Sequence, residues 1–281
     1  MRKLLSANFT RVFHSLLFWA CAVFMAVLGA FMAIMNYIDM KETNSINSID
    51  NIFFACAIFI GIVGAIFCSL FIGTEYSDGT IRNKIIVGHK RSAIYLANLI
   101  TAGAVSLLLC GISFLTTLCF GLPLLGGFTN DLKVILAIAL CTLLLSLALA
   151  SIFTLIALLC QNKAFTAILC VVFAFIVLLV GGYVIQRLQE PETYDAYVTT
   201  MGEEGAGASS TVQKDIPNPN YLRGTQRQIY QFLADFLPGG QAIQCNSCIV
   251  SNPPLLYAYS ILIILGTTGA GLLLFARKDL K

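Results

Sequence analysis

The charged residues of this chain gather in a short polar segment between two long apolar runs. The segment reads Glu75-Tyr-Ser-Asp-Gly-Thr-Ile-Arg-Asn-Lys84 and continues to His89-Lys-Arg91, whereas residues 51–74 and 92–130 contain no Asp, Glu, Lys or Arg. Asp78 is a predicted helix N-cap and Gly88 a predicted helix stop. A link between two apolar spans needs only a few turn residues, so this basic helix, over about 78–88, is predicted to contact another protein.

The isoleucines of this predicted helix are spaced for a binding face. Ile81 and Ile85 are four residues apart and share one side of a helix, which suits a groove in a partner. Glu75 would be costly if left unpaired at a membrane edge, so it is expected to meet a basic group or backbone N–H groups. Its role is open between a structural ion pair and coupling to a partner, and the whole segment has the alternative of being a basic anchor without a partner. Four basic residues would pair with a partner's acids or with lipid phosphates: Arg82, Lys84, Lys90 and Arg91.

The composition is that of a membrane protein. Hydrophobic residues make up 58% of the 281 residues and charged residues 11%, against roughly 25% charged in soluble domains. The apolar runs are solid blocks without two-residue alternation, which predicts an all-α protein rather than a barrel. Six segments are predicted to span the membrane: Ser15–Asn36, Ile52–Gly73, Ala93–Leu122, Val134–Gln161, Phe165–Ile185 and Leu255–Ala276.

The distribution of Lys and Arg predicts the orientation of these spans. Basic residues precede the first span, follow the second and the fourth, and follow the sixth, whereas the short loops on the other side contain only Lys41 and Lys133. Because cytoplasmic loops carry the excess of Lys and Arg, both termini are predicted to be cytoplasmic. The chain then forms a single transmembrane domain, with five spans in residues 1–185, an extracellular loop over 186–254, and the sixth span with a cytosolic tail in 255–281.

The N-terminal segment Arg2–Phe13 is amphipathic at helical spacing. Leu5, Phe9, Val12 and Leu16 are predicted to share its apolar face, with basic and hydroxyl residues opposite. Such a helix lies among the lipid headgroups before the chain enters the bilayer. The alternative is a plain extension of the first span.

The long outer loop is predicted to have two different halves. A Gly/Ser tract at 202–210 within an acidic stretch indicates a mobile segment. A second, amphipathic helix is predicted over Arg223–Leu237 and is ended by Pro238-Gly-Gly240. We interpret it as a lid or re-entrant element, with a plain loop cover as the alternative. Its apolar residues recur at helical spacing: Ile229, Phe232, Leu233 and Phe236.

Eight of the ten cysteines lie inside predicted spans, where Cys behaves as a small apolar residue. Cys245 and Cys248 form a CxxC pair in the outer loop, which favours a local disulfide in an oxidising exterior over two unrelated thiols. A zinc site is not expected, because His14 and His89 are both predicted on the cytoplasmic side, and we predict no metal site.

Catalytic motifs are missing from the sequence. It has no GxxxxGK[ST], GxSxG or HExxH pattern, so we expect no enzymatic activity of its own and no cofactor bound by this chain. The spans also lack the deep ionisable residue that ion-coupled transporters use. A secondary transporter is therefore disfavoured, and any energy for transport would come from outside the bilayer.

The segment Phe71-Ile-Gly-Thr-Glu75-Tyr-Ser-Asp-Gly79-Thr80-Ile-Arg, followed by Gly88-His-Lys-Arg91, resembles the permease subunits of type-2 ABC exporters. The ending Phe275-Ala-Arg-Lys-Asp-Leu280 and the order of the spans are similar too. The resemblance implies a prokaryotic plasma-membrane permease that forms a homodimer or a heterodimer with a related permease. Spans two and five would line the path by analogy with that family.

The resemblance also implies a separate ATPase subunit, which would bind ATP and Mg²⁺ and dock on the cytosolic coupling helix. Membrane lipids are further expected partners, and nucleic acid is not. The substrate is left unknown. A channel-like, immunity or sensor protein on the same permease fold is the alternative. The coupling residues that the resemblance and the spacing indicate are Glu75, Asp78, Gly79, Thr80, Ile81, Arg82, Lys84, Ile85 and Arg91.

Overall fold

Six long apolar helices form the body of the protein in this computed structural model, which describes residues 1–43, 47–200 and 209–278. Within these residues, each predicted span is a helix that is long and apolar enough to cross a membrane. The second span is interrupted near Phe54, so it consists of a short helix and a long one. The spans are α2 (Leu16–Thr43), α3 with α4 (Asp50–Phe53 and Cys56–Ser77), α6 (Arg91–Leu125), α7 (Leu132–Leu159), α8 (Lys163–Gln189) and α11 (Pro253–Arg277).

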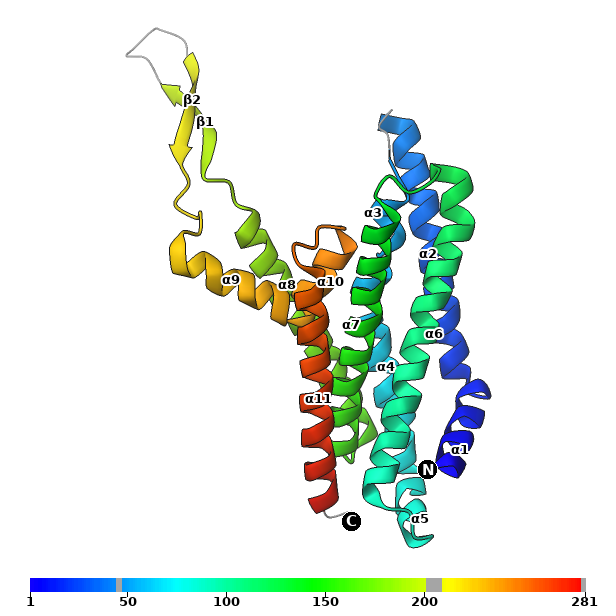
Figure 1. Cartoon of the computed structure of the whole chain (residues 1–281). Coiled ribbons are helices and arrows are strands. Elements are labelled where there is room, and N and C mark those ends of the chain that lie inside the picture. Colours follow the sequence, from blue (N-terminus) through cyan, green and yellow to red (C-terminus); the bar gives the residue numbers. More distant parts are fainter. Residues whose placement is uncertain (44–46, 201–208, 279–281) are drawn as a thin grey trace.

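Helix α4 lies at the centre of this body and is the most buried of the described spans. It packs against α7 and α8, while α2 packs on α6 and α11 on α7 (Figure 1). One narrow stripe along α4 is half-exposed. It consists of residues spaced four positions apart: Ile62, Ile66, Leu70 and Thr74.

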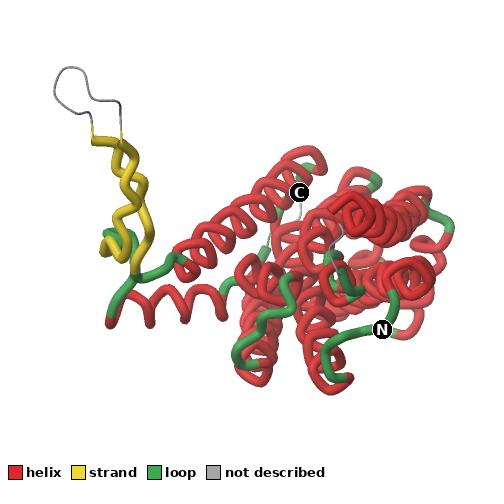
Figure 2. Tube along the Cα trace, turned by 90° about the horizontal axis from the view of Figure 1, so that it is seen from above, coloured by secondary structure: helices red, strands yellow, loops and turns green. Residues whose placement is uncertain are grey.

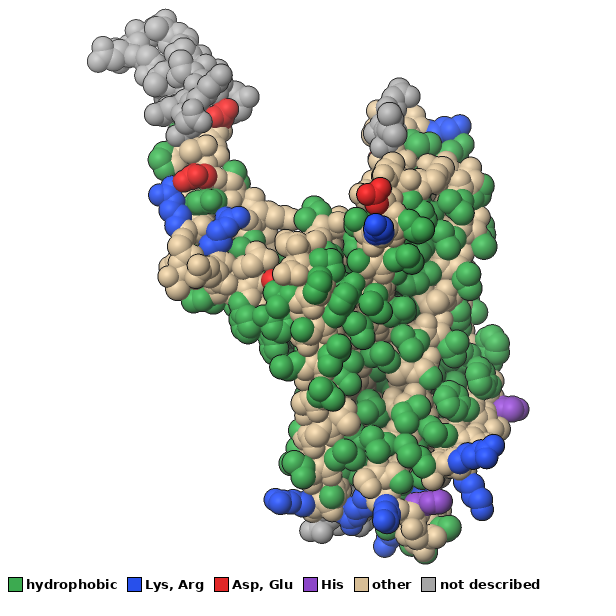
Figure 3. Space-filling view, viewed as in Figure 1, with side chains coloured by type: hydrophobic (Ala, Val, Ile, Leu, Met, Phe, Trp, Pro, Cys, Tyr) green, Lys and Arg blue, Asp and Glu red, His purple; other side chains and the backbone are tan. Residues whose placement is uncertain are grey.

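Both ends of the described chain lie on one side of the body, beside the short helix α5 (Thr80–Ile86) (Figure 1). We call this side the terminal face. Lys and Arg gather there, an apolar belt covers the middle of the molecule, and the acidic side chains in this view lie at the other end (Figure 3). This arrangement agrees with the predicted topology; which face is cytoplasmic stays a prediction.

The N-terminal helix α1 (Arg2–Phe13) buries a face that shares Val12 with the predicted one, while the predicted residues Leu5 and Phe9 are half-buried. Leu4, Asn8 and Val12, spaced four residues apart, are buried, and α1 packs mainly on α6. Leu16 is 85% exposed. The prediction about Leu16 was wrong because α1 ends at Phe13 and α2 begins at Leu16, so the chain changes direction before that residue.

The outer loop contains a β-hairpin, so the chain is mostly helical rather than all-α as predicted. Strand β1 (Thr193–Thr200) pairs antiparallel with β2 (Ser209–Pro217), with Thr193 opposite Pro217 and Thr200 opposite Ser209. Thr, Tyr and Val in β1 favour strand structure. The hairpin projects away from the helices at the point where α8 and α9 approach each other (Figure 2). Most of the tract predicted to be mobile, 202–208, lies outside the described residues.

The predicted outer-loop helix is α9 (Gly224–Phe236), and the proline that ends it also begins another helix. Pro238 is at the start of α10 (Pro238–Asn246), a position that requires no backbone N–H donor. Helix α10 returns into the body and packs against α8, α7, α4 and α9 (Figure 1). A Cβ on Gly239 would lie 1.9 Å from the carbonyl oxygen of Val177, so glycine permits this backbone contact between α10 and α8.

Buried polar groups join α9, α10 and α11. The amide of Gln244 donates to an Asp235 carboxylate oxygen at 3.0 Å, and the amide of Gln241 donates to the Asp235 carbonyl at 2.8 Å. Ser260 on α11 donates to the Gln241 oxygen at 2.8 Å. These bonds satisfy polar groups that would otherwise destabilise the buried contact.

Candidate functional site

Helix α5 on the terminal face is bounded at both ends by glycines in left-handed conformations. Gly79, with φ 67°, is the N-cap residue, and Asp78 ends α4 instead of capping α5 as predicted. Gly88, with φ 94°, lies just beyond the helix. Its N–H donates to the Ile85 carbonyl and the N–H of His89 donates to the Lys84 carbonyl, which together form a Schellman motif. The stop at Gly88 is confirmed, and the glycine at each end allows α5 to turn sharply between α4 and α6.

The isoleucines of α5 do not share one exposed face. Ile81 is 1% exposed and belongs to the main apolar core, and Ile85 packs against that core. Ile86 and Val87 are 74% and 77% exposed instead. The prediction that Ile81 and Ile85 form a surface face was therefore wrong, because the other side of the helix turns outward.

Glu75, near the end of α4, is fully buried, and it makes polar contacts with side chains of three other helices. One carboxylate oxygen lies 2.7 Å from Nη1 of Arg11 and 2.5 Å from Nζ of Lys84. The other oxygen accepts a hydrogen bond from Nδ2 of Asn98 at 3.1 Å. A buried carboxylate is costly unless it is paired and hydrogen-bonded, and here both conditions are met. Glu75 pairs with a basic group, as predicted. Lys84 is one of the basic residues of the predicted helix, whereas Arg11 comes from α1 and was not expected as a partner.

Two asparagines extend this cluster to α1 and α6. Nδ2 of Asn8 donates to Oδ1 of Asn98 at 3.0 Å, and Nζ of Lys84 donates to Oδ1 of Asn8 at 3.4 Å. We call the five residues Arg11, Asn8, Glu75, Lys84 and Asn98 the Glu75 network. It joins four helices: α1, α4, α5 and α6.

Sequence reasoning missed Asn8, Arg11 and Asn98 as members of this network. Signals for the two asparagines existed, because Asn8 is a polar residue four positions from both Leu4 and Val12, and Asn98 lies in a run without charges. Arg11 was assigned only to the basic side of α1. Its distance of 64 residues from Glu75 gave no pattern to read.

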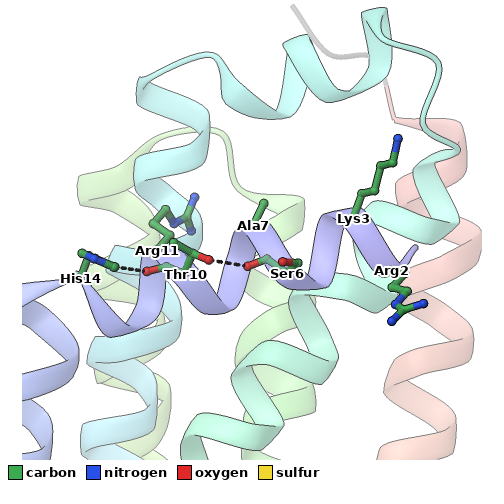
Figure 4. Close-up of a pocket in the computed structure, with 7 residues that line it drawn as sticks. All are labelled: Arg2, Lys3, Ser6, Ala7, Thr10, Arg11 and His14. Atoms are coloured by element: carbon green, nitrogen blue, oxygen red, sulfur yellow. Dashed lines mark hydrogen bonds between the residues drawn. The ribbon is translucent and has the colours of Figure 1, made fainter.

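Arg11 is held on two further sides. Its Nη2 donates to the carbonyl of Phe71 at 2.9 Å, and its guanidinium carbon lies 3.6 Å from the centroid of the Phe71 ring. Along α1, Arg11 and His14 lie near the end that leads into α2, with Arg2 and Lys3 at the other end (Figure 4). Thr10 donates to the Ser6 carbonyl between them. These side chains line a groove along α1 that is basic, because its lining includes Arg2, Lys3 and Arg11 and no acid.

A cavity of about 270 Å³ opens beside Glu75 between α5 and the turn before α8. The Tyr76 hydroxyl next to it donates to the Leu158 carbonyl at the end of α7. The same end of α7 accepts hydrogen bonds from Lys278, at 3.1 Å to Leu158 and 2.6 Å to Leu159. Four predicted coupling residues line the cavity: Glu75, Gly79, Ile81 and Arg82. The other lining residues, Tyr76 and Ser77 of α4 and Gln161 of the α7–α8 turn, were not predicted.

The remaining predicted coupling residues lie around this region in different settings. Asp78 and Arg82 are exposed, and Thr80 is half-buried with its hydroxyl donating to the Glu75 carbonyl at 3.1 Å. Arg91 donates to the Ala276 carbonyl at 3.1 Å and so contacts the C-terminal segment. The structure thus brings Glu75, Lys84 and Thr80 together and leaves Arg82 and Asp78 on the surface.

The predicted disulfide between Cys245 and Cys248 is absent: both thiols are free. Cys245 is buried and hydrogen-bonds with Cys141 of α7, whereas Cys248 donates to the Asp50 carbonyl at 3.2 Å. The prediction was wrong because Cys245 is in α10 and Cys248 is beyond its end, so the two side chains pack against different helices. Within the described residues, no group of His, Cys, Asp or Glu forms a candidate metal site.

Comparison with known proteins bears on the same part of the chain. The family model described as "ABC-2 family transporter protein" matches residues 4–181, which is more than half of the sequence and includes the whole Glu75 network and α5. A search of curated proteins gives no match.

Proposed function

Because the chain belongs to the ABC-2 transporter family, we propose that it is the membrane subunit of an ATP-driven exporter in a prokaryotic plasma membrane. Permeases of this family are transport subunits, are not enzymes themselves, and generally pair with an ABC ATPase. ATP and Mg²⁺ would be bound by that partner. The terminal face would be cytoplasmic, because it carries the excess of Lys and Arg.

The observation that carries this proposal is the Glu75 network. Lys84 ties α5 to Glu75 on α4, and the asparagines tie both to α1 and α6. Helix α4 packs in turn against α7 and α8. A displacement of α5 by a docked ATPase would therefore act on the central span through charged groups that cannot be separated cheaply in a buried setting.

The surface of α5 that would contact the ATPase is the one formed by Ile86 and Val87, with Arg82 and Asn83 beside them. Exposed apolar side chains at the end of a helix suit a groove in a partner, and Arg82 would pair with acids at its rim. The cavity beside Glu75 offers room for a side chain of the partner.

The path would form between two copies of the chain, or between this chain and a related permease. Helix α8 has an exposed apolar face, and α4 exposes the stripe of Ile62, Ile66, Leu70 and Thr74. These surfaces support the family analogy for spans two and five. The burial of α4 restricts its contribution to the part of that stripe away from the terminal face, Ile62 and Ile66, because Leu70 and Thr74 line a separate groove near that face.

The test is co-purification of the nucleotide-binding subunit with the tagged full chain from native membranes. Replacing Ile86 and Val87 with Asp should reduce its recovery at least tenfold, since burying each side chain is worth about 1.5–3 kcal/mol. The matched control replaces Leu132 and Ile249, 68% and 66% exposed on the opposite face, with Asp. Equal recovery with both double variants would show that α5 is not the docking surface, and absence of any ATPase with the wild type would contradict the exporter assignment.

A further inference from the structure

A second groove on the terminal face lies between the α1–α2 turn, α4 and the start of α8. Its volume is about 270 Å³, and it has a basic end and an apolar wall. The basic and hydroxyl side chains in its lining are Arg11, Lys163, Ser15 and Thr74, and the wall includes Leu17 and Leu70. None of the residues that line this groove is acidic.

The two cations of this groove are positioned in different ways, Arg11 by contacts of its side-chain guanidinium and Lys163 by the packing of its backbone. Arg11 is fixed by Glu75 and the Phe71 carbonyl, and a guanidinium with five N–H groups still has donors for another ligand. Lys163 is the first residue of α8, and its Cα lies 3.2 Å from the position that a Cβ on Gly73 would occupy. Glycine at 73 therefore lets the α8 terminus approach α4 and brings Lys163 to the same groove as Arg11.

The position of the groove connects it to the apolar belt. Its lining residues belong to the α1–α2 turn, the last turns of α4 and the start of α8. These segments lie toward the terminal face, where Lys and Arg gather at the end of the apolar belt (Figure 3). Apolar side chains next to it on α2 and α8 are exposed, among them Leu16, Trp19, Phe165 and Ile168. Tryptophan and basic residues are typical of the membrane interface, where phosphate groups meet hydrocarbon.

We propose that this groove binds the headgroup phosphate of an anionic phospholipid from the leaflet at the terminal face. Arg11 and Lys163 contact the phosphate, the Ser15 and Thr74 hydroxyls lie beside it, and an acyl chain follows Leu70 and Leu17 into the bilayer. Glu75 does not compete, because it is buried and already accepts bonds from Arg11, Lys84 and Asn98.

A second copy of the chain fits this groove less well than a lipid does. A two-fold symmetric contact places the same patch on both subunits. It would bring Arg11 and Lys163 of each copy together without an acid in the groove to separate them. An anionic ligand neutralises the same charges.

The test is lipid retention in native mass spectrometry of the full chain, purified with equal amounts of phosphatidylglycerol and phosphatidylcholine. The wild type should retain phosphatidylglycerol selectively. Lys163→Gln should lower its retention about fivefold, the factor that corresponds to about 1 kcal/mol per basic residue at an anionic surface. The Ser15 hydroxyl oxygen accepts a hydrogen bond from the Leu17 N–H at 3.2 Å at the start of α2. Ser15→Asp keeps an oxygen that can accept this bond and places a carboxylate in the groove, so it should lower retention as well. Lys163→Arg and the exposed Lys133→Gln on the opposite face should leave it unchanged.

Three outcomes would overturn the proposal. Unchanged retention in both Lys163→Gln and Ser15→Asp would remove the groove as a lipid site. Equal competition by soluble glycerol phosphate would assign the groove to a free phosphate compound instead. A change in oligomer mass in Lys163→Gln with unchanged lipid retention would make the groove a contact between copies. None of these results depends on docking of an ATPase, so the exporter assignment is tested separately.

Discussion

The ammonium of Lys84 on α5 lies 2.5 Å from the carboxylate of Glu75 near the end of α4, although a left-handed turn at Gly79 separates the two helices. Side chains nine residues apart do not meet in a continuous helix. The turn at Gly79 folds α5 back so that this pair forms. The charge relationship therefore depends on the same glycine that sets the direction of α5.

Glu75→Gln should destabilise the protein, because it leaves Arg11 and Lys84 without their carboxylate. Breaking a fully buried pair costs about 3–5 kcal/mol. Arg11 and Lys84 retain 35% and 17% side-chain exposure, and water screens them, so we expect about 2 kcal/mol. The measurement is the thermal unfolding midpoint in detergent. Asp78→Asn, which removes an exposed acid three residues away, is the control, and equal midpoints for the two variants would contradict this role for Glu75.

Gly239→Ala should separate α10 from α8. The new Cβ would meet the Val177 carbonyl oxygen at 1.9 Å, and a backbone atom cannot move as a flexible side chain does. Overpacking typically costs about 1–3 kcal/mol, and we expect the upper end here. Hydrogen exchange at the amides of α10 should become faster. Gly269→Ala in α11, where a Cβ meets nothing within 4 Å, should leave exchange in α10 unchanged; unchanged exchange in Gly239→Ala too would refute the close contact.

The thiol of Cys248 should react slowly with iodoacetamide at neutral pH. Burial, with the nearby Asp50 carboxylate, raises its pKa to about 11. Only the thiolate reacts, so the rate should increase about tenfold per pH unit from pH 8 to 10 without a plateau. Peptide mass spectrometry without reductant identifies the site, with Cys248→Ser as the blank. A plateau near pH 9, or a Cys245–Cys248 crosslink, would be inconsistent with this structure.

Lys278→Gln should lower the local stability of the α7–α8 turn by about 1 kcal/mol, because Lys278 donates to two carbonyl groups at the C-terminal end of α7. Limited proteolysis of the turn before α8 is a local readout, and it should become faster in this variant. The neighbouring Arg277 is exposed and serves as the matched control through Arg277→Gln. If Arg277→Gln accelerates cleavage equally, a general effect of charge explains the result.

Much of the architecture followed from the sequence, because it depends on local properties. About 20 apolar residues suffice to specify a span wherever they pack, and Gly88 stops a helix through its own backbone conformation. The excess of basic residues beside α5, the amphipathic Arg2–Phe13 segment and the helix at 223–237 were readable for the same reason. The hairpin was missed because the acidic composition around Glu190 and Glu203 concealed short Thr- and Tyr-containing strands.

The tertiary structure decided which surfaces face inward and which distant residues meet. Helical spacing places Ile81 and Ile85 on one side of a helix but does not say whether that side faces the core, and here it does. The separation of Arg11 from Glu75 along the chain, like that of Asn98 from Asn8, leaves no local pattern. A buried charge selects partners in three dimensions, so the Glu75 network became visible only when α1, α4, α5 and α6 were packed together.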